Sequence, residues 1–131
     1  ATNCMLKAVE MHGKDNIGYI NAHGTSTPAG DPVELESIKK VFKDKIPPIS
    51  STKSQTGHTL GAAGALESIF SLLMLKNSFI SKTLNLSSSI DEGEGLDLVS
   101  EVRDQDLDAV MNNSFGFGGT NVSLVFEKLK S

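Results

Sequence analysis

The first part of the chain alternates helix-like and strand-like patterns of apolar residues. Residues 2–12 carry apolar side chains at helical spacing and are followed by a glycine, which predicts a short helix. The segment 17–22 is short, apolar and rich in β-favouring residues, which predicts a buried strand. Asp31 and Pro32 suit the N-cap and first turn of a helix that continues through 33–42. The chain is therefore expected to begin as helix, strand and helix.

The second part is dominated by one strongly apolar helix. Apolar residues of 62–76 cover nearly the whole circumference of this helix, which is typical of a central helix buried on all sides. Residues 48–53 predict a strand leading to Lys53, and 81–86 is a further candidate strand. Residues 109–129 predict two strands around a glycine-rich turn. This order of elements predicts an α/β layered fold.

Composition then restricts the class of protein. The chain has 131 residues, of which 38% are hydrophobic, and 12 Lys and Arg against 16 Asp and Glu give a formal net charge of −4. The acidic balance, without a basic stripe, argues against nucleic-acid binding. The single cysteine, Cys4, cannot form an internal disulfide. The most apolar stretch, residues 62–75, is too short to span a bilayer, so we expect a cytoplasmic protein with no membrane partner.

His23 is the first candidate for chemistry. It follows the predicted strand 17–22, and open α/β sheets place their sites at the C-terminal ends of strands. The loop after it carries the hydroxyls of Thr25, Ser26 and Thr27. An equally open interpretation is a histidine that caps a turn, with the hydroxyls as local turn makers.

Lys53, His58 and Glu67 form the second candidate group. Glu67 lies in the helix expected to be buried, and an isolated buried carboxylate is costly, so Lys53 is its expected partner. A purely structural ion pair is the alternative for these two residues. His58 precedes the helix by about one turn, where the helix dipole disfavours protonation and favours a neutral ring that donates one N–H hydrogen bond.

The third candidate is the glycine-rich segment from Phe115 to Asn121. Its glycines permit close backbone approach, and two alternate phenylalanines, Phe115 and Phe117, could form a movable apolar gate. A tight hairpin is the alternative. The segment lacks the dinucleotide-binding and phosphate-loop patterns. The three histidines lack zinc-ligand spacing, so no metal site of this kind is expected.

Three motifs in this order resemble the C-terminal half of the β-ketoacyl-acyl carrier protein synthases. They are HGTSTPAGDPVELESI, SSTKSQTGHTLGAAGALES and NNSFGFGGTNVSLVFEKL, and the resemblance covers residues 1–131 as one domain, more like the type I than the type II enzymes. It implies the C-terminal half of a thiolase-like fold, a layered mixed sheet covered by helices. It also implies the family's acyltransferase reaction in fatty acid biosynthesis, a decarboxylative Claisen condensation of malonyl-acyl carrier protein with an acyl-enzyme.

The resemblance also implies roles for individual residues. His23 and His58 match two catalytic histidines whose N–H groups point at the malonyl thioester oxygen, while Lys53 and Glu67 match an active-site lysine and a buried glutamate. Phe117 matches a residue that contributes a backbone N–H to an oxyanion hole and also gates the acyl pocket. Further matches are substrate-binding Thr25, Thr27, Phe115 and Gly118, with Thr25 and Thr27 on the phosphopantetheine arm, and a monovalent-cation site near Asn112, Asn113 and Glu67.

The family's nucleophilic cysteine has no counterpart in this sequence. Cys4 does not match its context, so we expect that these 131 residues alone cannot form an acyl-enzyme or condense substrates. The implied partners are acyl carrier protein, the missing N-terminal half and a second copy in a homodimer. No cofactor is expected beyond the carrier's phosphopantetheine and the cation. The alternative is a non-catalytic half that binds pantetheine or a partner chain.

Overall fold

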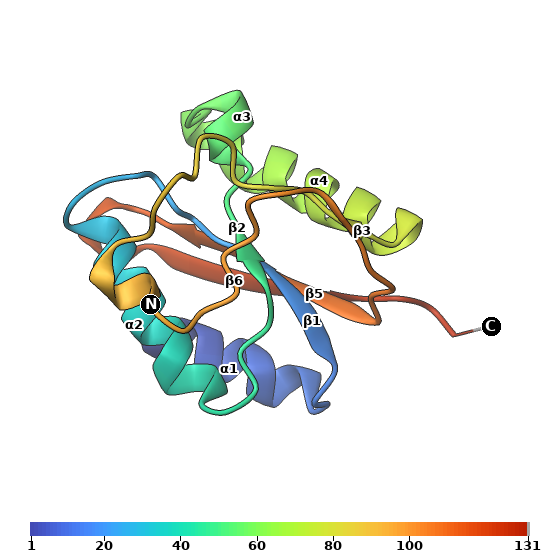
Figure 1. Cartoon of the computed structure of the whole chain (residues 1–131). Coiled ribbons are helices and arrows are strands. Elements are labelled where there is room, and N and C mark those ends of the chain that lie inside the picture. Colours follow the sequence, from blue (N-terminus) through green and yellow to red (C-terminus); the bar gives the residue numbers. More distant parts are fainter. Residues whose placement is uncertain (131) are drawn as a thin grey trace.

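The computed structural model describes residues 1–130 of the chain as one α/β unit (Figure 1). Its helices and strands, in chain order, are α1 (Thr2–His12), β1 (Ile17–Asn21), α2 (Gly30–Phe42), β2 (Ile49–Ser50), α3 (Lys53–Thr56), α4 (Ala63–Asn77), β3 (Phe79–Ile80), β4 (Arg103–Asp104), β5 (Ala109–Phe115) and β6 (Asn121–Glu127). Short 3-10 turns are η1 (Leu60–Ala62), η2 (Asp91–Gly93) and η3 (Phe117–Gly119).

A mixed four-stranded sheet in the order β2-β1-β5-β6 forms the centre. β1 is parallel to both of its neighbours, whereas β5 and β6 form an antiparallel hairpin. The C-terminal ends of β1 and β2 therefore meet at one edge of the sheet, which is where open α/β sheets carry their sites. The small β3-β4 ribbon stands apart from this sheet.

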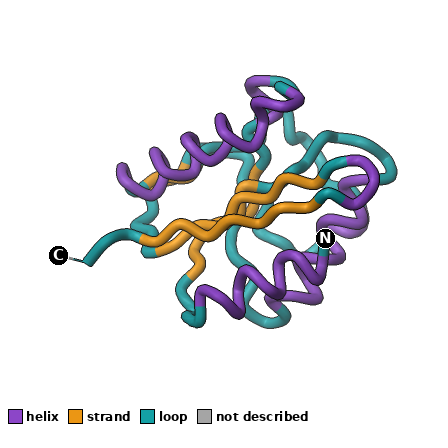
Figure 2. The backbone as a smooth tube through the Cα atoms, turned by 180° about the vertical axis from the view of Figure 1, so that it is seen from behind, coloured by secondary structure: helices purple, strands orange, loops and turns teal. Residues whose placement is uncertain are grey.

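Helices cover the two faces of the sheet unequally. α1 and α2 lie against one face and α4 against the other (Figures 1 and 2). Met5, Ile38 and Met111 belong to the core on the α1–α2 side, and Tyr19, Met74 and Val110 to the core on the α4 side. The layered arrangement expected from the order of elements is confirmed.

The start of α2 differs from the prediction. Ala29 is the N-cap residue, with no side-chain cap, and Asp31 stands within the first turn. The Asp31 carboxylate instead accepts a hydrogen bond from the backbone N–H of Ser26 at 3.1 Å. The helix begins earlier because Thr27 Oγ1 accepts the N–H of Gly30 at 3.0 Å and closes the turn before it.

The expectation that the helix over 62–76 is buried on all sides is wrong within this chain. α4 buries Glu67, Met74 and Leu75. Its opposite face is open, since Ile69 is 52% and Leu72 is 43% exposed. The physical reason is that a single sheet covers only one side of the helix in residues 1–130.

The segments 48–53 and 81–86 also differ from their predictions. β2 contains only Ile49 and Ser50, and Lys53 is the first residue of α3 rather than part of a strand. Residues 81–86 form no strand and run beside the start of α3, where Ser51 N–H donates to Thr83 Oγ1. Among residues 1–130, no helix is both long and apolar enough to cross a membrane.

Candidate functional site

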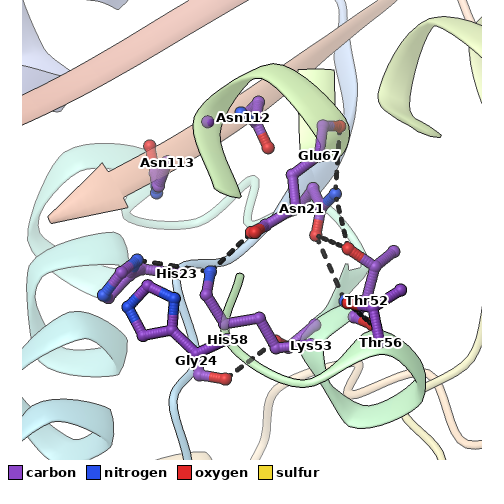
Figure 3. A network of polar contacts seen from close by, with 12 residues as sticks. Asn21, His23, Gly24, Thr52, Lys53, Thr56, His58, Glu67, Asn112 and Asn113 are labelled. Atoms are coloured by element: carbon purple, nitrogen blue, oxygen red, sulfur yellow. Dashed lines mark hydrogen bonds and ion pairs between the residues drawn. The ribbon is translucent and has the colours of Figure 1, made fainter. Parts of the chain in front are cut away.

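His23 and His58 come together at the C-terminal ends of β1 and β2. His23 follows β1 directly, and His58 lies in the loop between α3 and η1. Their ring centroids are 5.4 Å apart and the ring planes are nearly perpendicular, at 88° (Figure 3). The two candidate groups predicted from separate parts of the sequence are therefore one site.

The surroundings of His58 fix which ring nitrogen can donate. The backbone N–H of Leu60 donates to His58 Nδ1 at 3.2 Å. In a neutral ring the other nitrogen, Nε2, then carries the hydrogen. Leu60 is the first residue of η1, the short turn that precedes α4. The ring is exposed, so its Nε2–H is available to a substrate.

His23 is held in the same donor state by Lys53. Lys53 Nζ lies 3.3 Å from His23 Nδ1, and an ammonium group can only donate, so Nδ1 accepts and a neutral ring keeps its hydrogen on Nε2. Burial lowers the pKa of His23 from 6.5 to about 4, with help from the positive charge of Lys53 and from His58. The ring is therefore neutral near pH 7.

Lys53 forms a buried ion pair with Glu67, as predicted. Lys53 Nζ lies 2.5 Å from Glu67 Oε1, and the two side chains are only 4% and 2% exposed. Glu67 comes from α4, where the Ser71 hydroxyl donates a further hydrogen bond to the Glu67 backbone carbonyl. The ammonium lies between the carboxylate and His23 (Figure 3), so the pair is part of the site as well as of the core.

Glu34 is a site residue that the sequence analysis missed. Its carboxylate accepts the backbone N–H groups of His23 at 2.8 Å and Gly24 at 2.9 Å. Asn113 Nδ2 donates to it at 3.4 Å. Burial raises the pKa of Glu34, against the opposing effect of these hydrogen bonds. A signal was present, because Glu34 shares the buried face of α2 with Ile38, four residues later.

Thr25 and Thr27 are close to each other but differ in role. Thr27 Oγ1 accepts the N–H of Gly30 and lies 3.2 Å from Thr25 Oγ1, so the turn-making interpretation applies to it. Thr25 lines a cavity of about 520 Å³ together with Lys53 and His58. Thr25 and Ser26, but not Thr27, therefore place their hydroxyl residues on the cavity.

The two phenylalanines of the glycine-rich segment occupy different environments. The Phe115 ring lies 6.1 Å from the His23 ring, at the end of β5. Phe117 is fully exposed at the tip of the turn before β6. Gly118 follows it with a φ of 74°, a conformation that favours glycine. The predicted hairpin is present, and its first strand brings Phe115 next to His23.

Asn112 and Asn113 point to opposite faces of β5, as adjacent strand residues must. Asn113 Oδ1 accepts from Ser123 on the neighbouring strand, and its Nδ2 faces Glu34. Asn112 Nδ2 donates to Ser68 of α4. Asn112 Oδ1 is the one buried side-chain oxygen or nitrogen in residues 1–130 with no hydrogen-bond partner. It lies on the side of the sheet that α4 covers, the helix that carries Glu67.

Two further kinds of site in the part of the chain that the structure describes would be a metal centre and a reactive cysteine. No group of three or more His, Cys, Asp or Glu side chains there is placed to hold a metal ion. Cys4 is a half-buried free thiol in α1.

Known proteins resemble the chain along nearly its whole length. The family described as beta-ketoacyl synthase, C-terminal domain, matches residues 1–87. The 3-oxoacyl-(acyl-carrier-protein) synthase 1 of Escherichia coli K12 is 54% identical over 131 residues, which are 99% of this chain and 32% of that protein. The enzyme of the same name from Haemophilus influenzae is 54% identical over 129 residues, 98% of this chain and 32% of that protein. The chain thus spans about a third of the length of the curated relatives it matches.

Solved structures share the fold. A beta-ketoacyl synthase from Burkholderia phymatum STM815 is 42% identical with a TM-score of 0.92, over 98% of this chain and 32% of that one. The AntDE:AntF structure, described as a type II polyketide synthase acyl-carrier protein in complex with its ketosynthase, is 28% identical with a TM-score of 0.92, over 98% of this chain and 33% of that one. These matches confirm the predicted thiolase-like, layered ketosynthase fold.

Proposed function

The chain belongs to the beta-ketoacyl synthase C-terminal domain family, and from this premise we propose that it supplies the decarboxylating half of a 3-oxoacyl-(acyl-carrier-protein) synthase. Such an enzyme is an acyltransferase that elongates a fatty acyl chain by decarboxylative Claisen condensation. The chain spans about a third of its relatives, so the nucleophilic cysteine is proposed to lie in the other two thirds of the enzyme. The 131 residues alone are then inactive in condensation.

The observation that carries the proposal is the matched state of the two imidazoles. Each has its Nδ1 occupied as an acceptor, His58 by the Leu60 N–H and His23 by the Lys53 ammonium. Each neutral ring therefore offers an Nε2–H donor, and the rings lie 5.4 Å apart. Two neighbouring N–H donors, each held in place through its Nδ1, suit a carbonyl oxygen that gains negative charge.

Loss of carbon dioxide from a malonyl thioester creates such an oxygen. The bond between the carboxylate carbon and the α-carbon breaks, and its electron pair moves onto the thioester carbonyl as an enolate. The Nε2–H groups of His23 and His58 stabilise that enolate. Its α-carbon then attacks the acyl-cysteine carbonyl, a carbon–carbon bond forms, and the cysteine thiolate leaves.

We also propose positions for the rest of the substrate. Thr25, at the cavity, and Thr27 beside it contact the phosphopantetheine arm. Phe115 borders the reacting thioester, which its 6.1 Å distance from His23 supports. The Phe117–Gly118 turn supplies a backbone N–H to the acyl oxyanion and gates the acyl pocket, a role that suits its full exposure and its glycine.

The proposed partners are acyl carrier protein, the rest of the enzyme and a second copy of it in a homodimer. A structural relative is described as a ketosynthase in complex with an acyl-carrier protein, which supports the first. Packing of the rest of the enzyme is supported by exposed apolar side chains on the open face of α4, where Ile69 is 52% and Leu72 is 43% exposed. Such a patch favours contact with another protein surface. A cytoplasmic location is part of the proposal.

Asn112 Oδ1 supports a monovalent-cation site. An unpartnered buried amide oxygen is costly unless a water or ion contacts it. We propose that Asn112 and Glu67 hold the cation, which would give Asn112 Oδ1 its missing partner and add rigidity. Asn113 contributes no side-chain oxygen, because Ser123 occupies it.

Thermal unfolding tests the cation site. Replacing potassium by choline at equal ionic strength should lower the midpoint of thermal unfolding, and Asn112→Ala should abolish this difference. An unchanged unfolding midpoint in choline would contradict the site.

Decarboxylation in a hybrid enzyme tests the proposed function. The chain replaces the matching third of the E. coli synthase 1, and release of carbon dioxide from malonyl-acyl carrier protein is followed. His58→Ala should lower this rate by about 10²–10³-fold, the typical cost of one removed oxyanion donor. His12→Ala, which alters a histidine in α1, is the matched control. Equal rates for His58→Ala and the parent hybrid would overturn the catalytic proposal and favour a non-catalytic binding half.

A further inference from the structure

The outer edge of β2 carries a short parallel ladder. Ile49 N–H donates to the Asp97 carbonyl, and Val99 N–H donates to the Ile49 carbonyl, both at 2.9 Å. Ile49 and Leu98 form a parallel bridge between these bonds. In a regular parallel ladder the next donor, the N–H of Ser51, would reach the Val99 carbonyl.

Thr83 interrupts the ladder at this point. Its backbone N–H donates to the Val99 carbonyl at 2.8 Å, which takes the acceptor that Ser51 would have used. Its hydroxyl oxygen accepts the Ser51 N–H at 3.0 Å in return. Thr83 therefore stands between the two segments and satisfies both, so that β2 ends at Ser50 without an unpaired backbone group.

The end of β2 decides where Lys53 begins its helix. Two residues after Ser51 the chain has turned into α3, and Lys53 points into the core with its side chain 4% exposed. Ser51 also contacts the loop of His23, because its Oγ donates to the Gly24 carbonyl at 2.8 Å. A side chain at Gly24 would collide with Ser51, since an added Cβ would lie 2.7 Å from the Ser51 Cβ. The hydrogen bond between Thr83 and Ser51 therefore affects both the loop that carries His23 and the turn that leads to Lys53.

Neighbouring contacts support the same junction but do not replace Thr83. Leu84 N–H donates to Ser54 Oγ at 2.8 Å, and Gln55 Nε2 donates to Ser81 Oγ at 2.9 Å. Both acceptors are side-chain hydroxyls outside the sheet. Several hydrogen bonds in residues 1–130 join 81–84 to the region of α3. Of these, the bond to Thr83 is the one made by the backbone at the end of β2.

We propose that Thr83 is a positioning residue for decarboxylation, which fixes Lys53 and through it the neutral His23 by ending the β2 ladder at Ser51. This inference rests on the proposed function for its catalytic meaning. The charged and titratable groups that face His23 are Lys53 of α3, His58 of the next loop, Glu34 of α2 and, through Lys53, Glu67 of α4. Thr83 itself contacts no substrate.

The test compares Thr83→Val with Thr83→Ser in the hybrid enzyme. Valine keeps the shape of threonine but removes the acceptor and leaves the Ser51 N–H unpaired, whereas serine keeps the hydroxyl. We expect Thr83→Val to lower kcat for malonyl decarboxylation by about 10–100-fold, the range that a small misplacement costs, with little change in KM. Thr83→Ser and Ser87→Ala, an exposed residue of the same segment, should stay within about 3-fold of the parent.

A second readout separates positioning from general destabilisation. The Lys53 charge helps to lower the His23 pKa, so displacement of Lys53 should raise that pKa from about 4 toward 6.5 without reaching it, because burial persists. Ring-nitrogen NMR titration measures this shift whether or not the hybrid is active. Thr83→Ala takes the place of Thr83→Val if the valine variant fails to fold. An unchanged His23 pKa, or failure of serine to restore it, would overturn the proposal, whereas an inactive parent hybrid would count against the proposed function alone.

Discussion

At the scale of single residues, the site depends on one buried ammonium with two tasks. Lys53 Nζ contacts Glu67 Oε1 at 2.5 Å and His23 Nδ1 at 3.3 Å. The first contact offsets the cost of burying both charges. The second makes His23 an acceptor at Nδ1 and disfavours a positive ring. The ion pair therefore links the stability of the core to the protonation state of the His23 imidazole.

Removing the carboxylate should expose the structural task. Glu67→Gln leaves the Lys53 ammonium buried without its counter-charge, and we expect a loss of about 3–5 kcal/mol in unfolding free energy. Urea unfolding of the hybrid measures it. Glu36→Gln removes the negative charge of an exposed ion pair with Lys39 and should cost less than about 1 kcal/mol. Similar losses for the two variants would show that the buried pair has no special role.

Sequence reasoning reaches some of these residues and not others. The burial and pairing of Glu67 are predictable, because a carboxylate in an apolar helix needs a partner and Lys53 is the nearest lysine upstream. Glu34 shares a helix face with Ile38, but this spacing is a weak signal because a glutamate in an amphipathic helix usually faces water. Its burial depends on the backbone of His23 and Gly24, which only the folded loop brings to it. Thr83 acts on Ser51 across 32 residues, and no local pattern indicates such a contact.

At the scale of elements, the long periodic segments were predictable and their junctions were not. α1, β1, α4 and the β5–β6 hairpin lie close to their predicted ranges. The strand expected over 48–53 ends at Ser50 because Thr83 takes the next place in the ladder. Apolar residues surround α4, which predicts burial on all sides, yet one side of this helix is exposed in residues 1–130.

The open face of α4 is predicted to pack against the rest of the enzyme. If the rest of the enzyme packs on it, Ile69→Lys should place a charge in that interface and lower the thermal midpoint of the hybrid by several degrees, as expected for a loss of about 1.5–3 kcal/mol or more. Met11→Lys alters an 88% exposed residue at the end of α1 and serves as the control. Equal midpoints for the two variants would contradict the proposed packing face.

At the scale of the whole molecule, parallel strands bring distant loops to one edge. His23 follows β1 and Lys53 follows β2. Glu67 comes from α4 and pairs with Lys53. The sequence alone places these residues in two separate motifs, and the resemblance supplies their roles. Their distances and the tautomers of the rings follow only from the assembled sheet. The central claim is therefore that both rings are neutral and both donate through Nε2.

Ring-nitrogen NMR of the hybrid enzyme tests that claim most directly. With His23 and His58 assigned by substitution, spectra at pH 7 should show two neutral imidazoles, each with its hydrogen on Nε2 and an unprotonated Nδ1. On acidification, the His23 ring should stay neutral through pH 6.5 and take up its proton only near pH 4, because its pKa is lowered to about 4. A doubly protonated ring at pH 7, or a hydrogen on Nδ1 of either residue, would contradict the account.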